Sequence, residues 1–411
     1  MAKISKSIIK ENNLTLVKTN KYKNVNIYLR FAFEYDYALK VKLSVLSNML
    51  GETSLNYPTK ESMARQKDML YGFVINTSQT STGNVLNLNI NYDFINPKFL
   101  SGVDEKDFLE MIDETLYRPL FSKDFFNETI RNMKAAISRD LDVPSLLAGE
   151  NFIDEVSKDY PRFKIYSHNY TDILNTLTLK DIEDTYNSLF DTMVDIYLIG
   201  DYSPSIVEYL SKIKSNKDIR ISANFGDLKH RDEVDFVRDV SQSTLIVSYS
   251  EPYSRTDKMF YAFNLANIML GGIPSSLLFS EVREKNSLCY SISARGYRYD
   301  GLVIIKTEID AKNKNKALEE IYKQVKRMRD LDFDSDLLDV AKLMLINSVL
   351  SIDDDLDYFV DFLYGNKLND IDISVDEYIA KINSVTLQDI KEVMSNYKEY
   401  LVYFLEGSKH E

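Results

Sequence analysis

The side chains most often used for metal and acid–base chemistry are scarce and scattered in this sequence. The chain has three histidines, which are His168, His230 and His410. No two of them have the close spacing that brings two imidazoles onto one helix face as metal ligands. We therefore expect each histidine to be a surface or capping residue rather than a ligand.

The single cysteine and a run of aspartates are the other candidates for chemistry. Cys289 has no histidine near it in the sequence, which favours a buried, inert thiol over a nucleophile. Asp353, Asp354, Asp355 and Asp357 could suggest a calcium site. The run lacks the glycine and the spaced ligands of a calcium-binding loop, so helix capping is the better interpretation.

The charge balance argues against a nucleic-acid partner. The formal net charge is -13, whereas phosphate binding needs a basic surface. The segment Lys312 to Arg329 is locally basic, but acidic residues flank it, and we interpret it as a solvated helix face. The sequence therefore predicts no nucleic-acid interaction.

The cysteine content and the hydropathy pattern indicate a cytoplasmic protein. One cysteine excludes an internal disulfide and fits a reducing compartment. The sequence starts without the long apolar stretch of a signal peptide, and no apolar run approaches the roughly 18 residues of a membrane-spanning helix. We expect no membrane association.

The elements that must position any site repeat once along the chain. Thr178-Leu179-Lys180-Asp181-Ile182 recurs as Thr386-Leu387-Gln388-Asp389-Ile390, and a strand-like run and a glycine follow each copy. Each copy reads as a helix with threonine as its N-cap. A strand at 25–33 with a helix ending at Gly51 is likewise repeated by a strand at 244–249 with a helix ending at Gly271.

Duplication predicts two similar domains. Short turns join neighbouring strands and helices are grouped, as in 73–77 and 85–92 followed by helices at 104–117 and 123–140. This pattern is typical of an α+β fold with a largely antiparallel sheet in each half. We expect an N-terminal domain over 1–205, a linker over 206–235 and a C-terminal domain over 236–411.

The most specific motif runs from Leu270 to Ile292. It reads Leu-Gly-Gly-Ile-Pro-Ser-Ser-Leu-Leu-Phe-Ser-Glu-Val-Arg-Glu-Lys-Asn-Ser-Leu-Cys-Tyr-Ser-Ile. It resembles the C-terminal signature of the insulinase-like (pitrilysin, or inverzincin) metallopeptidases, which has a double glycine, Ser-Ser-Arg-Leu-Phe, Arg-Glu-Lys and Gly-Leu-Ala-Tyr-Ser. Leu277 replaces the usual arginine and Ser287 the usual glycine. The family's unit is two similar α+β domains of this size.

The resemblance implies where a zinc motif belongs, and the motif is absent there. Active members carry His-x-x-Glu-His on a helix of the first domain, where two histidines bind zinc and the glutamate activates water. The equivalent positions here are Ser44, Ser47 and Asn48. The third ligand, a glutamate, would fall near Arg131 or Asn132, and neither is acidic. We expect this chain to bind no metal.

The resemblance also assigns roles within the C-terminal motif. In active relatives an arginine and a tyrosine seven positions apart hold the substrate, and Arg283 and Tyr290 match that spacing. An arginine suits peptide carbonyls, and a tyrosine hydroxyl can donate to the oxyanion that forms during attack. We expect Gly271 and Gly272 to make a tight turn between helices, where side chains would obstruct.

Relatives of this size often work as heterodimers in which one subunit brings the zinc motif and the other the Arg/Tyr pair. A helix is expected from Thr59 to Leu70. The residues at its start, Tyr57-Pro58, and at its end, Leu70-Tyr71-Gly72, resemble those of zinc-less bacterial subunits, some of which are named for elongation factor P aminopentanol modification. The resemblance implies a non-catalytic, substrate-binding subunit that completes the active site of a homologous zinc-bearing partner in trans. Its substrate would be a peptide, in peptide maturation or leader-peptide removal.

Two other functions remain open at this point. One is a structural pseudo-peptidase, and the other is a peptide-binding chaperone or carrier without hydrolysis. A zinc-motif homologue encoded beside this chain would favour the peptidase pair. A peptide-modifying enzyme encoded there without such a homologue would favour the carrier.

Overall fold

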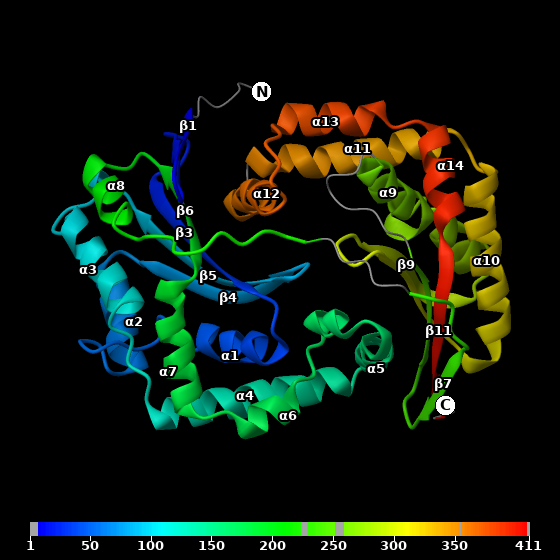
Figure 1. Ribbon diagram of the computed structural model, residues 1–411, viewed down its shortest axis with the longest axis horizontal. Helices are drawn as coiled ribbons and strands as arrows, with labels where there is room; N and C mark the ends of the chain where they lie inside the picture. The colour runs from blue at the N-terminus through cyan, green and yellow to red at the C-terminus, as the bar shows by residue number, and fades with distance from the viewer. Residues whose placement is uncertain (1–6, 223–227, 251–258, 354, 409–411) are drawn as a thin grey trace. The chain divides into compact units, whose positions relative to one another are not determined.

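The computed structural model divides into two compact units (Figure 1). The described residues are 7–222, 228–250, 259–353 and 355–408. The first unit comprises residues 1–137 and 169–221, and the second comprises residues 138–168 and 222–411. Each unit is one antiparallel-rich sheet with packed helices, which confirms the predicted α+β class. None of the described helices is long and apolar enough to traverse a bilayer.

The sheet of the first unit has six strands. Their order across the sheet is β1 (Ser7–Glu11), β2 (Leu14–Lys18), β6 (Met193–Gly200), β3 (Asn24–Glu34), β5 (Val85–Ile95) and β4 (Val74–Thr82). All neighbours are antiparallel except β2 and β6, which are parallel. The central strand β3 is apolar and buried along almost its whole length, and β4 lies at one edge.

Helices cover this sheet and close its core. They are α1 (Tyr37–Ser47), α2 (Lys60–Met69), α3 (Glu105–Leu116), α4 (Lys123–Leu141), α6 (Thr171–Thr176), α7 (Leu179–Ser188) and α8 (Pro204–Leu210). Phe73 on the approach to β4 stacks on Phe94 of β5, which stacks in turn on Phe108 of α3. Helix α1 packs against β4 and α7, so the helix expected to carry a zinc motif lies beside the edge strand.

The sheet of the second unit repeats this order with one strand fewer. It runs β7 (Val234–Arg238), β11 (Lys398–Gly407), β8 (Ser243–Ser250), β10 (Leu302–Ile309) and β9 (Cys289–Tyr297). Strands β7 and β11 are parallel and the other neighbours are antiparallel, as for β2, β6 and their neighbours in the first unit. This agreement is what the predicted duplication requires.

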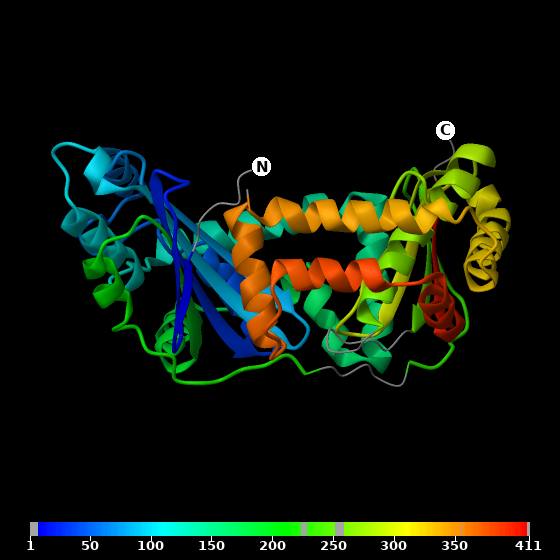
Figure 2. The ribbon, with the colours of Figure 1, turned by 90° about the horizontal axis from the view of Figure 1, so that it is seen from above.

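Most helices of the second unit follow its strands in the chain. They are α9 (Phe260–Asn267), the wide helical turns η4 (Ile268–Gly272) and η5 (Leu278–Lys285), α10 (Lys314–Asp330), α11 (Asp336–Leu350), α12 (Leu356–Leu368), α13 (Val375–Ser384) and α14 (Leu387–Asn396). Helices α11 and α13 lie side by side (Figure 1, Figure 2). The basic segment noted above contains α10, which buries Ile321, Val325 and Met328 and presents Lys316, Lys323 and Lys326 to solvent.

The two threonine-capped helices form as predicted. Thr178 starts α7, where its backbone N–H donates to the Asp181 carboxylate at 2.9 Å and its hydroxyl accepts from the Asp181 N–H at 3.3 Å. Thr386 and Asp389 make the same pair of bonds at the start of α14, at 2.8 and 3.3 Å. These reciprocal bonds satisfy donors that a helix start leaves unpaired.

The expected domain boundary at residue 205 needs correction at one segment. Helix α5 (Pro144–Asp159) and the turn η2 (Pro161–Tyr166) precede α6 in the chain but belong to the second unit. The apolar face of α5 explains this, because Phe152 and Val156 are buried in a core with Ile246 of β8 and Tyr403 of β11. Burial of that face against the second sheet outweighs proximity in sequence.

A buried polar cluster fixes this segment to the second unit. The Asp300 carboxylate, fully buried after β9, accepts from Tyr160 at 3.0 Å, from Arg162 at 2.9 Å, and from Tyr166. Burial and then the Asp300 carboxylate raise the pKa of the Tyr160 and Tyr166 hydroxyls, so both stay protonated as donors.

Part of the predicted linker over 206–235 is also packed structure. Ile206 and Leu210 are four residues apart on α8 and both are buried, and Tyr209 donates to the Asp113 carboxylate at 2.7 Å. Residues up to 221 therefore fold with the first unit. The four-residue spacing of Ile206 and Leu210 is the sequence signal for this short helix. Mixed charges surround it, and they led to the prediction of a linker.

Candidate functional site

The expected zinc-motif positions lie at the C-terminal end of α1. The Ser44 hydroxyl donates to the Lys40 carbonyl at 3.0 Å. The Ser44 carbonyl in turn accepts from the Ser47 hydroxyl at 2.9 Å and from the Asn48 amide at 2.8 Å. The three side chains are thus bound to the carbonyls of their own helix, and their hydroxyl and amide groups are poor ligands for Zn²⁺.

The same face of α1 is also bound to the edge strand. The Thr77 hydroxyl of β4 donates to the Ser47 carbonyl, and the Ser44 hydroxyl lies 3.4 Å from the Gln79 side-chain oxygen. These contacts fix the lateral position of β4 against the helix. Ser44 and Ser47 therefore support the edge of the sheet.

The expected third ligand position lies on α4, where Arg131 and Asn132 are exposed. Glu128, one turn earlier, forms an ion pair with Lys60 at 3.0 Å. Within the described ranges, no three His, Cys, Asp or Glu side chains come together as a group that could hold a metal ion.

Tyr290 and Arg283 lie on two adjoining elements at the other sheet's edge. Tyr290 is the second residue of the edge strand β9, and 64% of its surface is exposed. Arg283 lies on η5, exposed, with its guanidinium carbon 4.4 Å from the centre of the Phe279 ring. The Leu288 N–H donates to the Val282 carbonyl at 3.1 Å, which joins the end of η5 to the start of β9. Both functional groups face solvent.

Gly271 lies where a side chain would be obstructed, as the sequence predicts, but the obstruction comes from a neighbouring strand. Its φ is -159°, which any residue adopts, so no left-handed turn requires glycine there. A β-carbon at Gly271 would instead lie 2.6 Å from the Ala294 nitrogen of β9. Gly272 is exposed, and a β-carbon there would come no nearer than 3.4 Å to Ile268. Gly271 thus permits η4 to pack closely on β9, and Gly272 is not needed for it.

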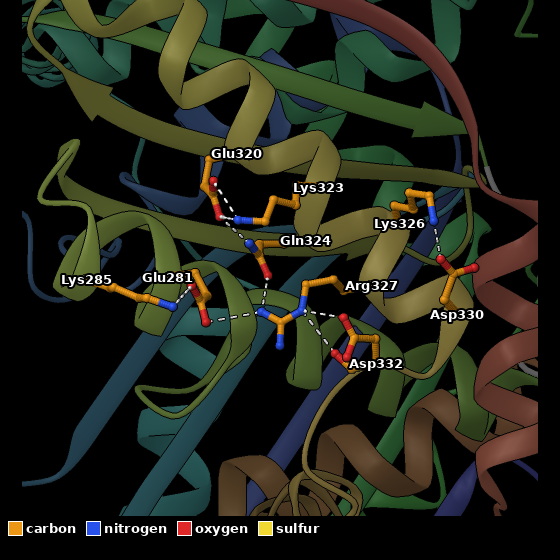
Figure 3. Close-up of polar contacts among 9 residues, drawn as sticks. All are labelled: Glu281, Lys285, Glu320, Lys323, Gln324, Lys326, Arg327, Asp330 and Asp332. Carbon is orange, nitrogen blue, oxygen red and sulfur yellow. Dashed lines mark hydrogen bonds and ion pairs between the residues drawn. The ribbon is translucent and has the colours of Figure 1, made fainter.

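A polar network missed at the sequence level holds η5 in place (Figure 3). Glu281 of η5 accepts from Arg327 of α10 at 3.1 Å and from Lys285 at 3.0 Å. Arg327 also donates to Gln324 at 2.9 Å, and Gln324 donates to Glu320. The hydrogen bond from Lys285 and then that from Arg327 lower the pKa of Glu281, which keeps it ionised. The sequence signal for this network was the four-residue spacing of Glu281 and Lys285, which is typical of an ion pair on one helix face.

The other candidates for chemistry have ordinary local surroundings. His168 is exposed, and His230 lies 3.5 Å from the Glu399 carboxylate. Burial raises the pKa of Cys289, which is only partly exposed, as expected for an inert thiol. Asp355 caps α12 by accepting from the Tyr358 N–H at 3.0 Å, as predicted. His410 and Asp354 lie outside the described residues.

Comparison with known proteins agrees with this architecture. Residues 176–345 match the family model described as the peptidase M16 inactive domain. The "Probable inactive metalloprotease YmfF" of Bacillus subtilis (strain 168) is 25% identical over 409 residues, covering 96% of this chain and 95% of that protein. M16 is the family of insulinase-like peptidases that the motif at 270–292 resembles.

Solved structures show the same fold over the full chain. A conserved protein from Enterococcus faecalis V583 superposes with a TM-score of 0.88 at 23% identity and covers 99% of both chains. A peptidase M16 inactive domain from Pseudomonas fluorescens gives a TM-score of 0.78 at 16% identity, covering 100% of this chain and 99% of the other.

Sheet order, the degenerate motif on α1 and the signature over η4, η5 and β9 define a two-domain peptidase homologue without a zinc motif. The chain is therefore similar to the insulinase-like (M16) peptidases, and residues 176–345 match the family model of their inactive domain.

Proposed function

We propose that this chain is the non-catalytic, substrate-binding subunit of a heterodimeric zinc metallopeptidase that acts on peptides in the cytoplasm. A homologous subunit would bring the zinc, and this chain would hold none. The observation that carries the proposal is the exposure of Tyr290 on the edge strand beside η5, at a position that matches the family's substrate-holding tyrosine.

The chemistry of the exposed pair fits a role toward a second polypeptide. Zinc on the partner can activate water, but the transition state still places negative charge on the former carbonyl oxygen. The Tyr290 hydroxyl and the Arg283 guanidinium are donors able to stabilise that charge. Both stand on well-supported elements, because Glu281 anchors η5 and Gly271 lets η4 pack on β9. Such support keeps donors oriented before the substrate binds.

Strand β4 supports peptide binding. An exposed strand edge accepts an extended peptide unless charges, prolines or bulges block it. Strand β4 reads Val-Ile-Asn-Thr-Ser-Gln-Thr-Ser-Thr, with no charge and no proline, and its pairing with β5 is unbroken from Val74 to Thr82. It is therefore the least protected of the described sheet edges.

The other edges carry the usual protection. Strand β1 has Lys10 and Glu11, and β7 has Asp235 and Arg238. Strand β9 has Arg295, and its pairing with β10 is interrupted by a register shift. We therefore propose β4 as the edge that receives the peptide backbone.

The test is co-purification with a homologue that carries His-x-x-Glu-His and is encoded beside this chain. The complex should cleave an unfolded peptide and contain zinc by mass spectrometry, whereas this chain alone should do neither. Tyr290→Phe should lower turnover by about 10²–10³, the usual effect of removing one oxyanion donor, with assembly unchanged. Cys289→Ala, next in the same strand, is the matched control and should leave turnover intact.

Three outcomes would contradict parts of the proposal. Unchanged turnover of the Tyr290→Phe complex would remove the role in trans. About one tightly bound zinc per isolated chain would show that the metal site has been misplaced. Peptide binding without cleavage by any complex would favour the second candidate, a peptide carrier, which the unprotected β4 edge also supports.

A further inference from the structure

Helix α11 is apolar on both of its faces. Leu337, Leu338, Ala341 and Val349 are buried, and the helix packs against α9, η4 and α13. The opposite face is exposed and equally apolar, with Val340 at 44%, Leu343 at 60%, Met344 at 42% and Leu350 at 54%. A helix that is hydrophobic all round is normally buried on all sides.

The exposed side chains form one continuous stripe. Positions 340, 343, 344, 347 and 350 follow the three- and four-residue spacing of a single helix face, and span about 15 Å at 1.5 Å per residue. Of these five, only Asn347 is polar, and no residue from 343 to 352 is charged. The one cation of the helix, Lys342, points elsewhere, because its ammonium donates to the Asn383 carbonyl at 3.1 Å.

Both ends of the stripe are acidic. Asp334, Asp336 and Asp339 are exposed at its N-terminal end. Beyond its C-terminal end, Asp355 is exposed at the start of α12, followed by the half-exposed ring of Tyr358. We name this surface, Val340 to Leu350 with its flanking aspartates and Tyr358, the α11 stripe.

We propose that the α11 stripe docks another polypeptide whose apolar face is bordered by lysines or arginines. Its length suits three or four large apolar side chains of a helix, the common mode of helix recognition. Carboxylates at both ends select a partner with cations at both ends, since complementary charge sets register and rejects other partners. The inference uses only α11 and α12, so it does not depend on the proposed peptidase role.

The same charges disfavour two other occupants. A second copy would bring Asp336 and Asp339 against the partner copy's own aspartates in either direction of pairing, and like charges oppose such contact. The net charge of -13 adds to this repulsion. An anionic membrane surface attracts basic amphipathic helices, whereas this stripe is bordered by acids.

Two synthetic helical peptides test the proposal with the full chain. Both carry leucines at three- and four-residue spacing; one is flanked at both ends by lysines and the other by glutamates. Fluorescence anisotropy should show at least about tenfold tighter binding of the lysine peptide, from several charge pairs acting together. The difference should shrink when salt is raised to about 0.5 M, because salt screens exposed charges.

Matched variants place the binding on the stripe. Leu343→Asp should lower affinity for the lysine peptide at least about tenfold, because a leucine at the centre of a contact contributes most. Leu55→Asp changes an equally exposed leucine of the first unit, and should leave binding unchanged. Circular dichroism should show that both variants keep the helix content of the parent chain.

Three results would overturn the proposal. One is equal binding of the two peptides, which would show that the aspartates select nothing. Another is equal binding by the parent chain and Leu343→Asp. The third is a dimer in sedimentation that Leu343→Asp dissociates, which would make a second copy the occupant.

Discussion

The close approach of η4 to β9 can be tested by adding one methyl group. In Gly271→Ala the new β-carbon would lie 2.6 Å from the Ala294 nitrogen and 2.8 Å from the Ala294 β-carbon. Ordinary contacts between such atoms are well above 3 Å, so either the helical turn or the strand must shift. Overpacking of this kind costs about 1–3 kcal/mol in a tightly packed interior. Both neighbours are backbone or attached directly to it, so the upper part of that range is expected.

The assay is thermal unfolding followed by circular dichroism. In a domain of 150–250 residues, each kcal/mol lowers the unfolding temperature by about 2–4 °C, so Gly271→Ala should lose several degrees. Gly272→Ala is the matched control, because its β-carbon meets nothing closer than 3.4 Å. In Gly272→Ala, the alanine lowers the conformational entropy of the unfolded chain, so the stability of the folded chain should be unchanged or slightly raised. Equal unfolding temperatures for the two variants would refute the close-approach argument.

Two further predictions concern charges. Asp300→Asn should destabilise the chain by about 3–5 kcal/mol in urea unfolding, because it removes the carboxylate charge that faces a buried arginine, whereas Glu61→Ala at an exposed ion pair should cost under about 1 kcal/mol. Hydrogen bonds from Lys18 and then Lys98 lower the pKa of Asp201 to about 2. Because the pKa of Asp201 in the folded chain is below its ordinary value of 3.8, this stabilisation is complete above that value and is lost as the pH falls toward 2. Asp201→Asn should therefore make unfolding less dependent on pH between 4 and 2, and an unchanged pH profile would contradict this.

Regular elements with local signals could be predicted from the sequence. Thr178 and Thr386 each carry an aspartate three residues on, and this local pairing alone specifies a helix start. Strand bounds such as those of β8, expected at 244–249 and found at Ser243–Ser250, agree within a residue for the same reason. The short strands β1, β2 and β7 were missed, because five residues offer too little periodicity.

The remainder depends on contacts far apart in sequence. Nothing near α5 indicates that its apolar face meets β8 and β11 rather than the first sheet. The acceptor shared by Tyr160, Arg162 and Tyr166 is Asp300, more than a hundred residues later. The candidate site likewise depends on contacts between distant residues. The sequence motif indicated Arg283 and Tyr290, but only the structure shows that Arg327 supports η5 and that Gly271 packs against β9.

The position of α5 also constrains how the chain can be synthesised. When residue 168 has left the ribosome, Phe152, Val156 and Phe163 have no sheet to cover them, because β8, β10 and β11 follow much later. Tyr400, which donates to Asp159 at 2.8 Å, is made 241 residues after it. The first half therefore cannot finish folding as an independent nascent domain, and an apolar helix stays exposed until β11 has been made. Expression of residues 1–221 alone would yield an aggregation-prone fragment, so the two halves form a single unit of synthesis despite their internal repeat.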